Sequence, residues 1–198
     1  MQIDLFQSSH LPPSGPSGLA FRGDVIGEAE ERELIHAIAA LPLTPFRFQG
    51  WLGKRLTTSF GWSYDFEKAQ VAAAPPMPDW LLPIRTRAAA FMDLPDDQLV
   101  QALLIRYDPG AGIGWHRDRP IFEHVVGISL GTPATLRLRL REEGGFQRHG
   151  VTLPRRSIYG LTGEARHKWE HSIVPMEETR WSITFRSLSL KGQRLLGL

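Results

Sequence analysis

Short runs of apolar and β-branched residues fill the second half of the chain, and clusters of glycine, proline and polar residues separate them. Runs of this length and composition predict β-strands. We expect strands over residues 99–107, 114–118, 123–130, 135–140, 150–153, 157–161, 169–173 and 181–187. Two facing sheets bury one side of every such strand, so this half of the chain predicts a double-sheet jelly roll.

Two helices are predicted ahead of these strands. Over residues 27–41, apolar side chains such as Leu34 and Ile38 recur at helical spacing, and a second helix is expected over residues 79–92. The predicted fold class is therefore α+β, with a double-stranded β-helix (jelly-roll) core and the N-terminal helices packed on one sheet.

A single domain is expected over residues 1–198, because the length suits one core and no internal repeat is visible. Serine, proline and glycine dominate residues 8–18, so residues 1–20 are predicted to form an extended arm. The jelly-roll core is expected over residues 99–190.

The composition excludes several classes of protein. No apolar run approaches the roughly 20 residues that a membrane helix needs, and the first residues lack the pattern of a secretory signal. The chain has no cysteine, so disulfides and thiolate metal sites are excluded. We expect a cytoplasmic monomer without a membrane partner. A net charge of +2 permits a nucleic-acid partner without requiring one.

Three residues predict a metal site. His116 and Asp118 lie two apart, so their side chains leave the same face of a strand. His171, from a distant strand, is the natural third ligand. Two imidazoles and one carboxylate, with the other positions open, are typical of non-heme Fe(II) oxygenases. The His-x-Asp pair taken alone also fits a surface salt bridge, and the three ligands also fit a hydrolytic zinc site.

Four segments in order resemble the AlkB family of 2-oxoglutarate- and Fe(II)-dependent dioxygenases. Arg106-Tyr107-x-Pro109-Gly110 leads into His116-x-Asp118, and a core strand follows at residues 126–130. Gly163-Glu-Ala-Arg166 then leads to His171-Ser-Ile173, and an Arg-x5-Arg strand runs from Arg180 to Arg186. The resemblance covers roughly residues 103–188.

The resemblance implies a role for each of these positions. His116, Asp118 and His171 would bind Fe(II), which 2-oxoglutarate would chelate. Arg180 would pair with the far carboxylate of 2-oxoglutarate, assisted by the hydroxyl of Tyr107, because a guanidinium offers a carboxylate two parallel hydrogen bonds. Arg186 would lie near the metal and position the near carboxylate or the substrate.

Two positions depart from the family pattern. Ile105 stands where the family usually has an asparagine that donates to the co-substrate. Pro120 stands where members that repair DNA tend to carry an acidic residue, and it offers neither a side-chain hydrogen bond nor a backbone donor. The metal chemistry therefore transfers to this chain more readily than the substrate does.

Residues 44–68 mix aromatic side chains, glycines and cations, and the resemblance implies a lid that recognises the substrate nucleotide. The candidate substrate-binding residues are Trp51, Arg55, Trp62 and Tyr64. Aromatic side chains there would stack on a base, and cations would meet phosphates. The alternative is a β-hairpin whose Phe60, Tyr64 and Phe66 fill the core.

A second group of cations lies in the core region. Arg137, Arg139 and Arg141 alternate with leucines along one predicted strand, which places all three on one face. That face is either an ordinary solvated surface or a track for phosphates.

The expected function is oxidative demethylation of N-alkylated bases in DNA or RNA, with O2 as oxidant and either DNA repair or RNA demethylation as the purpose. An enzyme that acts on a base needs the base extruded or single-stranded. Two alternatives stay open. The first is an oxygenase of the same fold acting on another substrate, such as a methylated protein side chain. The second is a metal-binding relative without catalytic activity, which is suggested by Ile105 in place of the asparagine that donates to the co-substrate.

Overall fold

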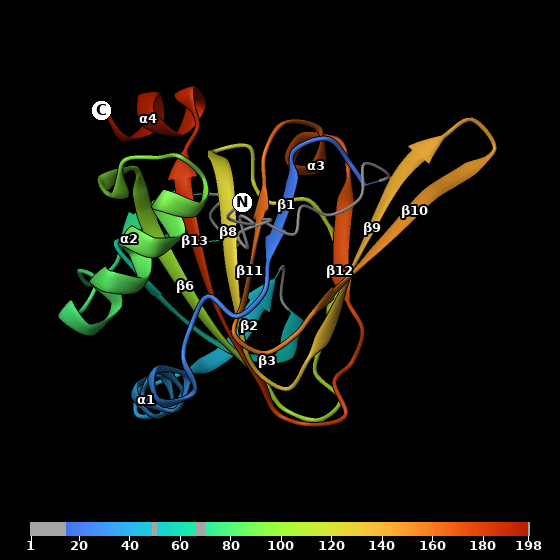
Figure 1. Ribbon diagram of the computed structural model, residues 1–198. Helices are drawn as coiled ribbons and strands as arrows, with labels where there is room; N and C mark the ends of the chain where they lie inside the picture. Colours follow the sequence, from blue (N-terminus) through green and yellow to red (C-terminus); the bar gives the residue numbers. More distant parts are fainter. Residues whose placement is uncertain (1–14, 49–50, 66–69, 198) are drawn as a thin grey trace, which may run out of the picture.

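The computed structural model describes residues 15–48, 51–65 and 70–197, and their strands form antiparallel sheets (Figure 1). The large sheet takes the order β1 (Leu19–Arg22), β11 (Ser157–Leu161), β8 (Phe122–Gly131), β13 (Arg180–Leu188), β6 (Leu99–Tyr107), β3 (Trp51–Phe60) and β2 (Thr44–Phe48). The small sheet takes the order β10 (Gly145–Leu153), β9 (Ala134–Glu142), β12 (Glu170–Ile173) and β7 (Ile113–His116). A separate hairpin pairs β4 (Trp62–Asp65) with β5 (Gln70–Ala73).

The two larger sheets face each other, and the predicted jelly roll is confirmed. Side chains from both sheets meet in one buried cluster, which includes Tyr107, Val125, Leu136, Leu138 and Trp169. Leu136 and Leu138 belong to β9, and the arginines that alternate with them point to the other side of the small sheet, as residues do at period two.

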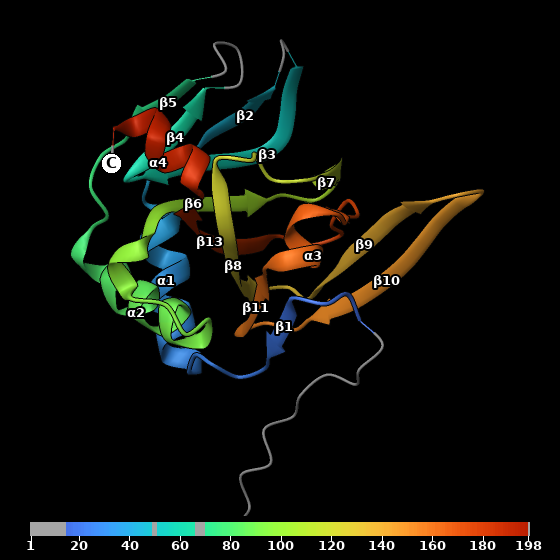
Figure 2. The same cartoon turned by 90° about the horizontal axis from the view of Figure 1, so that it is seen from above.

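Helices α1 (Glu28–Ala39) and α2 (Leu82–Phe91) cover the other face of the large sheet, as expected (Figures 1 and 2). Ile38 of α1 and Ile84 of α2 pack in a cluster with Leu104, Ile128 and Phe185 of the sheet. The short 3-10 helix η1 (Asp79–Leu81) precedes α2, so the predicted second helix begins with a different winding.

Strand β13 shows how one sequence serves both faces. Trp181, Ile183 and Phe185 belong to the cluster under the helices, whereas the residues between them turn toward the small sheet. Those inward-facing residues are polar: Arg180, Ser182, Thr184 and Arg186. A buried strand with polar groups on its inner face indicates that the interior of the jelly roll is a site.

Several boundaries differ from the expectation. Strand β7 ends at His116, so Asp118 lies in the following loop rather than on the predicted strand. Strand β10 begins at residue 145 instead of 150, because hairpin pairing with β9 continues where no apolar alternation is present.

Several short elements were not predicted, among them one strand and two helices. Strand β1 pairs with β11, so Leu19 and Ala20, at the end of the predicted arm, belong to the large sheet. Residues 1–14 of that arm lie outside the described residues. Helices α3 (Gly163–His167) and α4 (Leu190–Leu196) are too short to show a clear period. No helix in the described ranges has both the length and the apolar content needed to cross a bilayer.

Replacing Phe185 with alanine is expected to lower the free energy of unfolding by about 3–5 kcal/mol, as deletion of a buried phenyl ring typically does. The ring is fully buried between the large sheet and the helices. Denaturant unfolding followed by circular dichroism measures the change. Leu190→Ala is the control, since Leu190 is 71% exposed and should shift stability by less than about 0.5 kcal/mol. Equal stabilities of the two variants would contradict the assigned core.

Candidate active site

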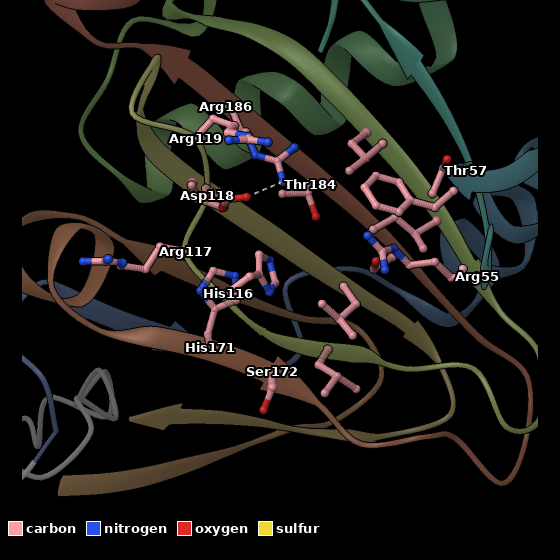
Figure 3. A pocket seen from close by; sticks show the side chains of 18 of the residues that line it. Arg55, Thr57, His116, Arg117, Asp118, Arg119, His171, Ser172, Thr184 and Arg186 are labelled. Atoms are coloured by element: carbon pink, nitrogen blue, oxygen red, sulfur yellow. Dashed lines mark hydrogen bonds and ion pairs between the residues drawn. The ribbon is translucent and has the colours of Figure 1, made fainter. Parts of the chain in front are cut away.

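His116, Asp118 and His171 come together at one end of the space between the sheets (Figure 3). One potential ligand atom from each residue lies within 4.8 Å of those of the other two. His171 is directly opposite His116 in the pairing of β12 with β7, and their ring centroids are 4.2 Å apart. Cross-strand neighbours of this kind point the same way, so the register of the small sheet brings the two imidazoles together.

Asp118 has one oxygen engaged and one oxygen without a partner. Its Oδ1 accepts a hydrogen bond from Arg186 Nη2 at 3.1 Å, whereas its buried Oδ2 has no hydrogen-bond partner. Burial alone would raise the pKa of Asp118, but Arg186, His171 and His116 more than offset it, so the pKa lies well below its usual range. A buried, ionised and unpaired carboxylate oxygen is costly unless a cation binds it.

The two imidazoles are suited to the same cation. His116 Nδ1 lies 2.9 Å from the carbonyl oxygen of Gly114, so a proton on Nδ1 leaves Nε2 free as a ligand. Burial, followed by repulsion from His116, lowers the pKa of His171 to about 3. The His171 ring is therefore suited to the neutral form that binds metals. The three residues fit a divalent metal ion with open positions.

Arg180 and Tyr107 form a second polar group inside the jelly roll. They are opposite each other in the pairing of β13 with β6, and the Arg180 guanidinium lies 5.0 Å from the centre of the Tyr107 ring. Arg180 is 1% exposed; its Nη2 donates to the hydroxyl of Ser129, while its Nε and Nη1 have no partner. A desolvated guanidinium with two unpartnered nitrogens fits a carboxylate.

Ile105 is buried and lines the same cavity, and it supplies no hydrogen-bond donor. Hydroxyl donors lie on the two neighbouring strands instead. Thr57 of β3 and Ser182 of β13 are each opposite Ile105 in the strand pairing, and both line the cavity. Hydroxyl groups are therefore present on either side of Ile105, where the resembled family usually has an asparagine.

A cavity of about 1130 Å³ joins the three candidate ligands to the residues of β2 and β3. Arg55 of β3 lines this cavity, and its guanidinium stacks 3.8 Å from the centre of the Phe46 ring. Burial lowers the pKa of Arg55, and its Nε has no hydrogen-bond partner. In Figure 3 the Arg55 side chain extends into the space shared with His116 and Asp118.

The other candidate substrate residues are placed differently. Trp62 does not line the cavity, whereas its neighbour Ser63 does, because successive residues of β4 point to opposite sides. The side chains of Trp51 and Tyr64 lie outside the described residues. Phe60 packs in the core cluster under the helices, as the hairpin alternative expected.

Tyr159 of β11 also lines the cavity and was not assigned a role from the sequence. Burial raises its pKa to about 12, so the phenol keeps its proton and can donate a hydrogen bond inward. Gly127 of β8 lies under the ring; a Cβ there would come within 2.3 Å of Tyr159 ring atoms. Glycine at this position therefore leaves room for the tyrosine.

Two further residues, Arg166 and Gln101, act on Asp118 indirectly, through the groups that they hydrogen-bond. Arg166 of α3 donates to the carbonyl oxygens of Arg119 and Phe122, at 2.6 and 2.7 Å, and thereby holds the loop that carries Asp118. Gln101 accepts from Arg186 Nη1 at 3.0 Å and orients the guanidinium that contacts Asp118. Arg166 belongs to a recognised motif, but its partners are backbone atoms that no sequence pattern identifies.

Comparison with protein families decides between oxygenase and hydrolase chemistry for this site. Residues 47–195 match the model of the 2OG-Fe(II) oxygenase superfamily. The chain belongs to this superfamily. Fe(II) and 2-oxoglutarate are accordingly its metal and co-substrate, and the triad of His116, Asp118 and His171 fits that metal. The hydrolytic zinc alternative is set aside.

Individual relatives confirm the AlkB-like resemblance of this oxygenase. The chain is 30% identical over 169 residues to the mouse tRNA (carboxymethyluridine(34)-5-O)-methyltransferase ALKBH8, which covers 81% of this chain. It is 29% identical over 132 residues to the alpha-ketoglutarate-dependent dioxygenase AlkB of Escherichia coli, covering 59% of this chain and 58% of that protein. The chain spans about a quarter of the length of the ALKBH8 proteins, 24% for the mouse protein.

Solved structures confirm the fold. The structure of OsALKBH1 aligns with a TM-score of 0.68 at 15% identity, over 86% of this chain and 96% of that one. A Pseudomonas putida prolyl-4-hydroxylase aligns with a TM-score of 0.63 at 13% identity, over 91% and 94%. At such identities the likeness extends to the jelly roll and not to the substrate.

Proposed function

We propose that this oxygenase removes N-linked alkyl groups from bases in DNA or RNA. The main support for this proposal is the cavity that extends from His116, Asp118 and His171 to Arg55, which belongs to the segment predicted as a lid. A small diacid such as 2-oxoglutarate fills only part of about 1130 Å³, which leaves room for a nucleoside beside the metal. The AlkB protein of Escherichia coli, an alpha-ketoglutarate-dependent dioxygenase, supports this choice.

In this proposal the residues divide the work between them. His116, Asp118 and His171 hold Fe(II), which with 2-oxoglutarate and O2 supplies the oxidising chemistry when bound. Arg180 and Tyr107 hold the far carboxylate of 2-oxoglutarate, and Arg180 has two nitrogens, Nε and Nη1, without another partner for that purpose. Arg186 keeps Asp118 ionised and oriented, and the apolar cluster between the sheets excludes water from the reacting groups.

Arg55 contacts the substrate in this proposal, and its replacement tests the lid side of the cavity. Arg55→Leu removes the guanidinium that stacks on Phe46 and leaves an apolar side chain in its place, so kcat/KM for an alkylated oligonucleotide should fall about 10–100-fold. The dissociation constant of 2-oxoglutarate should not change. Lys54→Leu, at an exposed neighbouring position, is the control. If Arg55→Leu instead weakened the binding of 2-oxoglutarate, Arg55 would be assigned to binding the co-substrate and not the substrate.

The deciding experiment starts from protein reconstituted without O2, with Fe(II) and 2-oxoglutarate. It is then exposed to O2 with single-stranded DNA and RNA oligonucleotides carrying 1-methyladenine or 3-methylcytosine. Mass spectrometry follows loss of the methyl group, and succinate is measured in the same samples. Demethylation of either strand type supports the proposal. Succinate formation without demethylation would overturn the substrate assignment while keeping the oxygenase.

A second candidate substrate follows from Pro120. This residue is exposed at the cavity rim and offers no group that could hydrogen-bond a damaged base. Other substrates are therefore included: methylated peptides and total tRNA, the latter because the ALKBH8 relatives are named as acting on tRNA. A mass gain of one oxygen on tRNA or loss of a methyl group from a peptide would identify the alternative.

A further inference from the structure

The outer face of the small sheet carries a group of cations that the proposed active site does not use. Arg137, Arg139 and Arg141 project from β9, and Arg148 of β10 is directly opposite Arg139. We call these four residues the arginine ladder. Their spacing is regular, because every second residue of a strand lies about 6.6 Å further along.

Two aromatic rings hold the arginine ladder flat against the sheet. Arg139 lies 4.5 Å from the centre of the Trp115 ring and 4.4 Å from that of Phe146, and Arg137 also stacks on Trp115 at 4.9 Å. Arg141 and Arg148 each lie 5.7 Å from the centre of the Phe146 ring. A stacked guanidinium uses its flat face, so its in-plane N–H groups remain available to an anion.

The charge of this face is largely uncompensated. Glu170 of β12 is opposite Arg139 and pairs with it at 2.7 Å, while Arg137 Nε donates to the neutral hydroxyl of Ser172. Arg141 and Arg148 are exposed and form no ion pair within the described chain. Among the described residues, Arg139 is the one ladder residue that forms an ion pair, so the other three guanidiniums keep their positive charge without an ion-pair partner.

The arginine ladder is continuous with the entrance to the metal site. Trp115 of β7, which stacks under Arg137 and Arg139, is among the residues that line the metal cavity, as are Glu170 and Ser172. The β9–β10 hairpin projects away from the body of the molecule, so the ladder extends outward from that entrance (Figures 1 and 2). If a base of a nucleic-acid strand entered the cavity, the neighbouring phosphates of that nucleic acid would lie within reach of the arginine ladder.

We propose that the arginine ladder is a docking track for the phosphate backbone of the nucleic-acid strand whose modified base enters the metal site. This inference rests on the proposed function and specifies where the rest of the strand lies. The recognition is independent of sequence, because guanidiniums contact phosphates and not base edges. Charge complementarity and the regular spacing along β9 favour an extended, phosphate-rich partner.

The test compares two charge-matched double variants. Arg141→Gln/Arg148→Gln removes two ladder cations, and Arg32→Gln/Arg194→Gln removes two exposed cations from α1 and α4. Binding of a fluorescein-labelled single-stranded oligonucleotide is measured by anisotropy over a series of NaCl concentrations. For single strands, each phosphate contact contributes about 0.7 to the slope of log K against log salt concentration. The ladder variant should therefore lose about 1.4 of the slope, and the control variant should keep it.

The outcomes separate this inference from the proposed function. Both variants should retain the 2-oxoglutarate affinity of the unaltered protein, because no ladder residue contacts the candidate ligands. A ladder variant that keeps the full salt slope, in a protein that demethylates oligonucleotides, would overturn the docking track alone. An unaltered protein that shows no salt-dependent binding and no demethylation would overturn the track together with the proposed substrate.

Discussion

Asp118→Ala is expected to abolish 2-oxoglutarate turnover, with succinate formation reduced by more than about 100-fold, since changes outside the ligand shell alone typically cost 10–100-fold. The variant loses the oxygen of Asp118 that has no other partner, Oδ2, and leaves the Arg186 guanidinium facing the metal position without its counter-charge. Both effects weaken the binding of a divalent cation. Binding of Ni(II), followed by titration calorimetry, and succinate formation with Fe(II) measure the two consequences separately.

Two further variants make this result interpretable. Asp118→Asn retains an oxygen that can accept from Arg186 but lacks the charge, so it should fold normally and still bind metal far more weakly. Asp97→Ala removes an exposed carboxylate from the short helix η2 (Asp96–Gln98) and should behave like the unaltered protein. Full metal-dependent turnover in Asp118→Asn would remove Asp118 from the ligand set.

Arg180→Lys is expected to weaken 2-oxoglutarate binding by about 10–100-fold, which corresponds to the loss of one strong charge-assisted hydrogen bond. Lysine keeps the positive charge but cannot present two parallel N–H groups to a carboxylate. The turnover rate at saturating 2-oxoglutarate should change much less than its KM. Titration of 2-oxoglutarate into Ni(II)-loaded protein measures affinity without requiring activity.

The specificity of this effect can be checked with 2-oxobutyrate, which lacks the far carboxylate. If Arg180 binds that carboxylate, Arg180→Lys should leave 2-oxobutyrate affinity unchanged. Arg106→Lys is a matched control on the opposite strand, since Arg106 points away from the cavity, toward Trp181 and Asp108. If Arg180→Lys lost affinity equally for 2-oxoglutarate and 2-oxobutyrate, the variant would disturb the part of the site near the metal. That result would contradict the role assigned to Arg180.

The strand-rich half of the chain was predictable because its pattern is local. Strands β6 and β11 have the expected bounds, and alternation along β9 correctly separated the leucines from the arginines. Elements without such a pattern were missed. Strand β1 forms because β11 offers an unpaired edge, and α3 has only five residues, so neither carries a period that a sequence could reveal.

The candidate site was predictable only in part, for a related reason. His116, Asp118 and His171 could be named because their residue types and order are characteristic, although the strand expected to carry Asp118 ends at His116. The placement of residues in the segment predicted as a lid was less predictable, since Arg55 lines the cavity and Trp62 does not. Which face of a strand lines a cavity depends on its pairing partners.

The sequence by itself determined the chemistry of this protein: the ligand types, the arginine suited to a carboxylate, and an interior able to hold them. Tertiary structure alone decided which of these groups meet. Arg166 reaches backbone carbonyls 44 and 47 residues away, and the arginine ladder lies flat because Trp115 comes from another strand. The physical reason is that spacing along one strand sets the face of each side chain, whereas contact between distant residues depends on the register between strands.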